Sequence, residues 1–170
     1  MSWLTRRQRD GGIDPVPLPA GIAGRLWLCG KHAIGPDHES LVAEVGGSAT
    51  VVCLTERHEI DDRYPGYVTW LDDPSSPTRW FPIHDLHAPD PATMQRFGAE
   101  LADRLRGGET LVVHCAAGMG RAGTTAVCVL LALGVPLDDA VDTVARARPG
   151  AGPESGVQRE LVHEPADRLR

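Results

Sequence analysis

Short apolar runs rich in β-branched residues alternate along this chain with longer segments whose apolar residues recur every three or four positions. Residues 110–114 form the clearest short run, and residues 91–106 form the clearest long segment. The first pattern is typical of a buried strand, and the second is typical of a helix with one apolar face. Strands that alternate with helices favour a mainly parallel sheet that is flanked by helices on both faces. The sequence therefore predicts an α/β fold.

The same criteria predict the remaining elements. Further strands are expected at residues 25–29, 49–54 and 79–83. The last of these should lie at an edge of the sheet, because Pro82 cannot donate to a ladder. Further helices are expected at about residues 36–45, 64–73, 122–133, 136–147 and 155–163, the last ending before Pro165.

The N-terminal segment differs in composition from the rest. Residues 1–23 combine a basic cluster, the Gly11-Gly12 pair and three prolines with few apolar side chains that could be buried. Such a segment is predicted to be a flexible N-terminal arm. Residues 24–170 are then expected to form a single domain, and a chain of 170 residues is long enough for one hydrophobic core.

Charge and composition argue against several classes of function. The chain has 17 Lys and Arg against 23 Asp and Glu, a net charge of −6, whereas nucleic acids and anionic membrane surfaces attract basic proteins. No apolar run approaches the roughly 18–20 residues of a membrane span, and the basic start lacks the apolar stretch of a secretory signal. The four cysteines show no CxxC spacing. We therefore expect a cytoplasmic protein with free thiols and with neither nucleic-acid nor membrane partners.

The segment from His114 to Thr124, HCAAGMGRAGT, carries the most chemical information. Cys115 directly follows a predicted buried strand, and Arg121 directly precedes an apolar helix, with two glycines between them. Such a loop can turn successive backbone N–H groups inward, and the helix dipole adds to the anion site that they form. This setting favours the thiolate form of a cysteine. Because arginine offers a planar pair of donors, the pattern predicts a bound phosphate with a nucleophilic sulfur beneath its phosphorus.

The sequence HCAAGMGR resembles the HCxxGxxR loop of cysteine-dependent protein tyrosine phosphatases, and most closely that of their compact dual-specificity branch. The resemblance extends over roughly residues 24–163. Residues 25–30 are similar to the opening strand of that family, and residues 81–89 are similar to its general-acid loop. Residues 148–150, followed by Glu154, Ser155 and Gln158, are similar to the end of its conserved region.

This resemblance implies a role for individual residues. Cys115 would be the nucleophile and Asp85 the general acid. The supporting residues would be His114 and Gln158. The phosphate would be held by Arg121 and the loop backbone, which consists of Ala116, Ala117, Gly118, Met119 and Gly120. It implies a phosphorylated protein as substrate, a cysteinyl-phosphate intermediate, neither a metal nor an organic cofactor, and a monomeric enzyme.

Several alternatives stay open at this stage. His84, His87 and Asp90 flank Asp85 and could donate the proton instead. The substrate could be phosphotyrosine, phosphoserine or phosphothreonine, a phosphoinositide or a small phosphate ester. The loop carries no lysine for additional phosphates, and this favours a singly phosphorylated substrate.

Two residues raise further questions about turnover and redox chemistry. The family usually has Ser or Thr directly after the loop arginine, whereas this chain has Ala122. A phosphate-binding pseudophosphatase is therefore the alternative to an enzyme. Cys53 lies at the end of a predicted strand and could approach Cys115 to form a reversible disulfide, whereas Cys128 is predicted to be a core residue.

Overall fold

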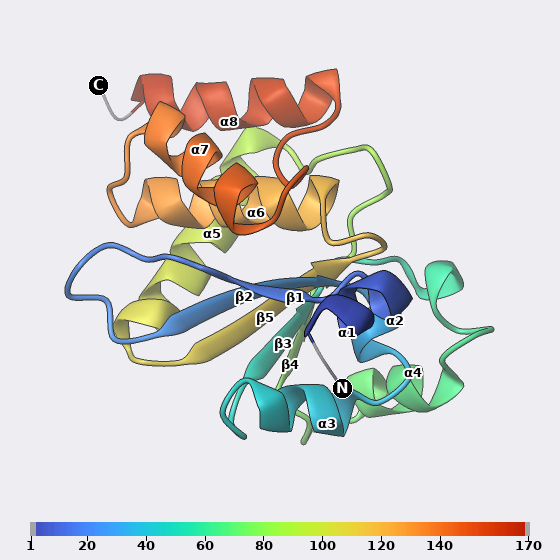
Figure 1. Ribbon diagram of the computed structural model, residues 1–170. Coiled ribbons are helices and arrows are strands. Elements are labelled where there is room, and N and C mark those ends of the chain that lie inside the picture. Colours follow the sequence, from blue (N-terminus) through green and yellow to red (C-terminus); the bar gives the residue numbers. More distant parts are fainter. Residues whose placement is uncertain (1–2, 169–170) are drawn as a thin grey trace.

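A five-stranded sheet forms the centre of the computed structural model, which describes residues 3–168 and the side chains of residues 7–163 (Figure 1). The strands lie in the order β1-β2-β5-β3-β4. Only β1 runs antiparallel to its neighbour, and the other neighbouring pairs are parallel. The strand bounds are Ile13–Val16 for β1, Arg25–Gly30 for β2, Thr50–Cys53 for β3, Thr78–Trp80 for β4 and Thr110–Cys115 for β5.

The helices form a layer on each side of this sheet (Figure 1). On one side lie α2 (Lys31–Ile34), α3 (His38–Glu44) and α4 (Pro65–Asp72), with the 3₁₀ turn η1 (Arg57–Glu59) between α3 and α4 in the chain. On the other side lie α5 (Pro91–Arg106), α6 (Gly120–Ala132), α7 (Leu137–Ala147) and α8 (Gly156–Arg168). The first helix, α1, spans Trp3–Asp10. The predicted α/β fold with its mainly parallel sheet is confirmed.

Two separate apolar clusters fill the spaces between these layers. The larger cluster joins the α5–α8 layer to the sheet, and the smaller one joins the α2–α4 layer to the sheet. The central strand β5 contributes to both, because successive side chains of a strand point to opposite faces. Val113 and Cys115 belong to the larger cluster, and Val112 belongs to the smaller. The carboxyl end of β5, where the chemically informative loop begins, is therefore fixed from both sides.

The N-terminal segment is not the flexible arm that composition suggested. Within it, β1 pairs with β2 along its whole length, from Ile13 opposite Cys29 to Val16 opposite Leu26. The positive φ angles of Gly11 and Gly12, 80° and 70°, turn the chain from α1 into this strand. The side chains of Ile13 and Val16 are buried. The few apolar residues of the segment are thus sufficient to fix it, because they fall on buried positions of an edge strand.

Two further expectations needed correction. Helix α8 continues past Pro165 to Arg168 instead of ending before the proline. Strand β4 is the predicted edge strand, but it ends at Trp80 rather than Ile83. Beyond β4 the amides of Phe81 and Ile83 still donate to the carbonyl oxygens of Cys53 and Leu54, at 2.8 and 2.9 Å. Pro82 interrupts the ladder without releasing the chain, so the following loop starts beside the carboxyl end of β3.

Candidate active site

The loop between β5 and α6 makes a tight turn at Gly118, which has a φ of 76°. A β-carbon at this position would lie 2.4 Å from the carbonyl oxygen of Cys29. Glycine is therefore needed both for the backbone conformation and for the close approach to β2.

Two of the loop carbonyls are held from outside by Arg148, a side chain that is almost fully buried. Its Nη2 donates to the carbonyl oxygen of Ala117 at 2.9 Å, and its Nε donates to that of Gly118 at 3.0 Å. The O and N–H of a trans peptide point in opposite directions. The N–H groups that follow these carbonyls, those of Gly118 and Met119, are therefore directed to the inside of the loop.

The carbonyls on either side of this pair are held in the same way. The amide of Lys31 donates to the oxygen of Ala116 at 2.9 Å. The oxygen of Met119 accepts from Gly123 at 2.8 Å and from Gly152 at 3.2 Å. Four successive carbonyls thus have donors on the outer side, and among the described residues the N–H groups of residues 116–119 donate to no acceptor. This arrangement, at the start of α6, is a concave anion site.

Arg121 lies at the start of α6 with its guanidinium almost fully buried. Its two terminal nitrogens donate to the carboxylate of Glu59, each at 2.8 Å, and Nη1 also donates to the carbonyl oxygen of Ile83 at 2.8 Å. The remaining donor, Nε, is buried and has no partner among the described residues. A buried N–H without an acceptor is costly, and an oxyanion bound by the loop would supply one.

Glu59 is the functional residue that the sequence analysis missed. It lies in η1, and its carboxylate also accepts from the amide of Glu56 at 2.7 Å. Partial burial alone would raise the pKa of Glu59, but the bonds from Arg121 and Glu56 outweigh burial and lower it. The carboxylate is therefore ionised at neutral pH and holds Arg121 in one orientation. No local motif marks this residue, because its partner lies 62 positions away.

Asp85 lies in the loop after β4, as the resemblance implied, and its carboxylate is 64% exposed. One oxygen is 3.4 Å from Nη2 of Arg121, and the same oxygen accepts from the amide of Leu86 at 3.0 Å. Leu86 has a φ of 62°, which a non-glycine residue seldom adopts. The structure therefore brings Asp85 to the guanidinium of the loop and leaves its carboxylate accessible.

The alternative proton donors have other partners. Asp90 caps α5, where it accepts from the amide of Thr93 at 3.0 Å and from its hydroxyl at 2.6 Å. These bonds lower the pKa of Asp90, so it is a carboxylate with a structural task. His84 contacts Glu56 at 2.9 Å through Nδ1, and His87 packs against the ring of His84.

His114 lies beneath the loop and is fully buried. Its Nδ1 donates to the carbonyl oxygen of Cys115 at 3.2 Å, and its Nε2 accepts from the hydroxyl of Tyr67 at 2.5 Å. Burial raises the pKa of Tyr67 well above its usual value, so the phenol keeps its proton. Burial also lowers the pKa of His114 to about 4. His114 is a neutral ring that fixes the backbone at Cys115.

Gln158 joins α8 to the loop that carries Asp85. Its Oε1 accepts from the amides of Glu154 and Ser155, at 2.9 and 3.4 Å, and its Nε2 donates to the carbonyl oxygen of His87 at 3.3 Å. The side chain is buried. It contacts the backbone on both sides of the site, which fits the supporting position that the resemblance implied.

The four cysteines are separated by the sheet. In the register of the sheet, Cys29 and Cys53 both lie opposite His114, whereas Cys115 lies opposite Gly30. Cys29 and Cys53 belong to the smaller cluster, and Cys115 and Cys128 belong to the larger. The side chains of Cys53 and Cys115 therefore point to opposite faces, and a disulfide between them is incompatible with this geometry. That hypothesis is wrong.

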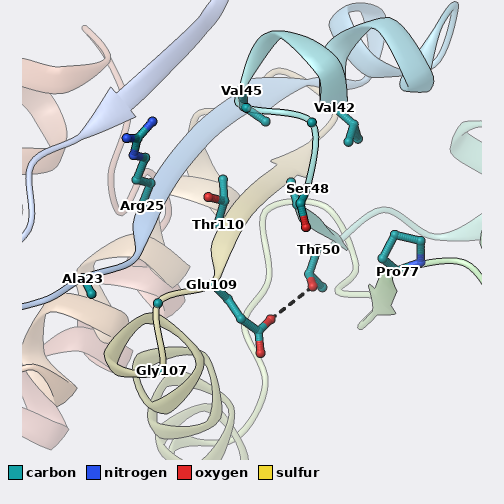
Figure 2. Close-up of a pocket in the computed structure, with 14 residues that line it drawn as sticks. Ala23, Arg25, Val42, Val45, Ser48, Thr50, Pro77, Gly107, Glu109 and Thr110 are labelled. Atoms are coloured by element: carbon teal, nitrogen blue, oxygen red, sulfur yellow. Dashed lines mark hydrogen bonds between the residues drawn. The ribbon is translucent and has the colours of Figure 1, made fainter.

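A wide hollow lies away from the loop of residues 115–121. A hollow of about 780 Å³ lies at the other end of the sheet, where Arg25, Thr50 and Thr110 begin β2, β3 and β5 (Figure 2). It is lined by turns such as Gly46-Gly47 and contains none of the residues around Cys115.

Among the described residues, no group of three or more His, Cys, Asp or Glu side chains could hold a metal ion. No described helix is long and apolar enough to cross a membrane.

Comparison with known proteins identifies the family. Residues 25–165 match the family described as "Swiss Army Knife protein, DSP-PTPase phosphatase domain". Among solved structures, Tk-PTP in its active form is 26% identical with a TM-score of 0.68, and the alignment covers 86% of this chain and 95% of that one. Kinase associated phosphatase is 22% identical with a TM-score of 0.73, covering 92% and 94% of the two chains. Human DUSP28 is 20% identical with a TM-score of 0.66, covering 92% and 95%.

The similarity to kinase associated phosphatase and to human DUSP28 shows a shared fold. The family match spans most of the chain. The loop from Cys115 to Arg121 lies inside the matched residues. This chain therefore belongs to the DSP-PTPase phosphatase domain family, as a compact protein tyrosine/dual-specificity phosphatase.

Proposed function

We propose that this protein hydrolyses phosphotyrosine, and also phosphoserine or phosphothreonine, in protein substrates through a cysteinyl-phosphate intermediate. The observation that carries the proposal is the loop of residues 115–121. Its outer carbonyls accept hydrogen bonds from outside the loop, while the amides of residues 116–119 and the Nε of Arg121 have no partner among the described residues. Such a site binds a tetrahedral oxyanion. Cys115 ends β5 where this loop begins, and that position supports its assignment as the nucleophile.

In the first step, the thiolate of Cys115 forms a bond to phosphorus while the bond to the ester oxygen breaks. The electron pair of that bond goes to the leaving oxygen, and Asp85 donates the proton that makes it an alcohol or phenol. The loop amides and Arg121 donate hydrogen bonds to the other phosphoryl oxygens and stabilise their negative charge. This assignment gives Ala116, Ala117, Gly118, Met119 and Gly120 a role through their backbone only.

In the second step, water attacks the phosphorus of the cysteinyl-phosphate. Asp85, now a carboxylate, takes a proton from that water, and the bond between sulfur and phosphorus breaks to restore the thiolate. The products are inorganic phosphate and the free enzyme.

The side chains of the loop support a singly phosphorylated substrate. Ala116, Ala117 and Met119 place no cation near the amides that would hold the phosphate. A phosphoinositide with several phosphates would need such cations to offset its charge. We propose a phosphorylated protein as the substrate, and we propose that the enzyme is a monomer.

The nucleophile is tested by labelling and by substitution. With iodoacetate at pH 6, Cys115 should react ahead of the other three cysteines, and orthovanadate should protect it. Release of phosphate from p-nitrophenyl phosphate should be lost in Cys115→Ser. A pseudophosphatase would bind vanadate without turnover, and preferential labelling of Cys29 or Cys128 would contradict the assignment.

The general acid is tested by Asp85→Asn. The variant should lower kcat for a phosphotyrosine peptide by about 10²–10⁴-fold and remove the alkaline limb of the pH profile. An aryl phosphate with an acidic leaving group should lose less, because that group needs less protonation. Equal losses with both substrates would indicate a structural role for Asp85, and His87→Asn would then be the next variant.

A further inference from the structure

The buried guanidinium of Arg148 has its counter-charge on the N-terminal strand. Nη1 of Arg148 is 2.8 Å from Oδ2 of Asp14 in β1, and both side chains are almost fully buried. The same nitrogen donates to the carbonyl oxygens of Gly11 and Gly12, at 3.1 and 3.2 Å. Among the described residues, Asp14 is the one carboxylate that forms an ion pair with Arg148. A segment more than 130 positions away therefore completes the surroundings of this arginine.

The other side of the same guanidinium holds the phosphate loop. Nε and Nη2 donate to the carbonyls of Gly118 and Ala117, which orients the N–H groups of Gly118 and Met119 toward the anion site. The guanidinium is rigid and planar, so the partners of Nη1 fix the direction of the other two donors. The contacts of Asp14, Gly11 and Gly12 with Nη1 thus set the direction of two of the loop amides.

We propose that residues 11–14 are a positioning segment of the active site, in which Asp14 acts on phosphate binding through Arg148. This inference rests on the proposed function, because it assigns the segment to the anion site of that function. The segment lies outside residues 25–165, which match the family. Asp14 is a positioning residue: its carboxylate pairs with Arg148 through Oδ2 and with Arg7 through Oδ1, and it acts on the loop through Arg148.

The matched pair of variants is Asp14→Asn and Leu41→Ala. Asp14→Asn keeps the shape of the side chain and removes its charge. Leu41 is a fully buried residue of α3 in the smaller cluster, away from the phosphate loop, so Leu41→Ala controls for lost stability alone. Tungstate is the probe: its inhibition constant and kcat/KM for p-nitrophenyl phosphate are measured at a temperature at which all variants are folded. Asp14→Glu, which restores the charge, is the rescue variant.

We expect Asp14→Asn to weaken tungstate binding by about tenfold or more and to lower kcat/KM by a similar factor. Leu41→Ala should lower Tm with neither effect, and Asp14→Glu should recover part of the affinity. If Asp14→Asn does not fold, the paired substitution Asp14→Leu with Arg148→Met removes both buried charges together. It should fold and should show the same loss of tungstate affinity.

Each outcome distinguishes the two proposals. Wild-type activity with unchanged tungstate affinity in Asp14→Asn would overturn the positioning role and leave the phosphatase function intact. Tungstate binding by a wild type without turnover would overturn the phosphatase function, and the affinity of Asp14→Asn would still decide the role of Asp14. If the wild type neither binds tungstate nor hydrolyses p-nitrophenyl phosphate, both proposals are wrong.

Discussion

At the scale of single residues, the guanidinium of Arg121 is held in place before any phosphate arrives. Arg121 donates two bonds to the carboxylate of Glu59 and one to the carbonyl oxygen of Ile83, and these fix its plane. Its Nε is left with no partner in the part of the chain described. A side chain that is already oriented loses little conformational entropy on binding. We therefore expect Glu59 to contribute to phosphate affinity by holding Arg121 in one orientation.

Glu59→Gln tests whether Glu59 contributes to phosphate binding through Arg121. It removes the charge that holds Arg121, and a hydrogen bond to a charged group contributes about 1.5–3 kcal/mol. We expect the inhibition constant of inorganic phosphate to rise by about ten- to a hundredfold, as measured by competition with p-nitrophenyl phosphate. Glu100→Gln is the matched control. Glu100 accepts two bonds from Arg79, at 2.9 and 3.1 Å, and this pair lies away from the loop. An equal rise in both variants would indicate a general effect of charge.

A second prediction at this scale concerns Ala122, where the family usually has a hydroxyl. The nearby hydroxyl of Thr124 is buried without a partner among the described residues, so it does not donate to the sulfur of Cys115. Departure of the thiolate should then be slow, and the second step should limit turnover. Rapid mixing with a good aryl phosphate should show a burst of phenolate that matches the enzyme concentration.

Ala122→Ser should supply the missing donor. One bond to a developing charge is worth roughly 1.5–3 kcal/mol, or about ten- to a hundredfold in rate. The burst should shrink and kcat should rise, with little change in kcat/KM. A wild type that shows no burst, together with an unchanged kcat in the serine variant, would show that another group already protects the leaving thiolate.

At the scale of elements, the loop after β4 combines a hydrogen bond to Asp85 with a strained backbone conformation at Leu86. The amide of Leu86 holds the carboxylate of Asp85, and Leu86 reaches this position only with a positive φ while 56% of its surface is exposed. This backbone conformation costs an L residue about 1–2 kcal/mol. The loop therefore places Asp85 at the expense of local stability.

Leu86→Asn should recover part of that cost, because Asn adopts the left-handed region more readily. We expect the free energy of unfolding to rise by about 0.5–1 kcal/mol in a urea titration, with kcat close to that of the wild type. Val157→Asn is the control, since Val157 is similarly exposed but lies in α8. A gain in both variants would point to removal of an exposed apolar side chain instead of relief of strain.

The elements also show what the sequence can predict. The bounds of α5 follow from an acidic cap at Asp90, a proline at its start and a regular apolar face, all of which are local features. Strand β1 has no such signal, because glycines and prolines surround it. Its order comes from pairing with β2 and from the contact of Asp14 with Arg148, which lies 134 positions away. The loop from Cys115 to Arg121 is contiguous in the sequence and can be predicted as a unit. Glu59 cannot, because its partner Arg121 lies 62 positions away.

At the scale of the whole molecule, the sheet buries a titratable ring between its two helix layers. His114 is fully buried with a pKa of about 4, below its usual value of 6.5, because burial disfavours its charged form. As the pH falls below 6.5, the unfolded chain binds a proton at His114 and the folded chain does not, so stability is lost until the pH reaches about 4.

This linkage predicts a measurable slope. Between pH 7 and pH 5, the free energy of unfolding should fall by about 2 kcal/mol through His114 alone. Urea titrations at several pH values should show this fall, and His114→Asn should flatten it even if the variant is less stable at pH 7. A slope that survives the substitution would assign the proton uptake to other groups.

The position of the cysteines on the two faces of the sheet has a consequence under oxidative stress. Peroxide converts an activated thiolate to a sulfenic acid, which a neighbouring thiol can trap as a disulfide before further oxidation. Cys53 and Cys29 lie on the far face of the sheet from Cys115, and Cys128 lies about 12 Å along α6 from its start. The chain's own cysteines therefore offer the oxidised sulfur no rescue. We therefore expect recovery of an oxidised Cys115 to require small thiols from outside the chain, and prolonged exposure to peroxide without them to give the irreversible sulfinic acid.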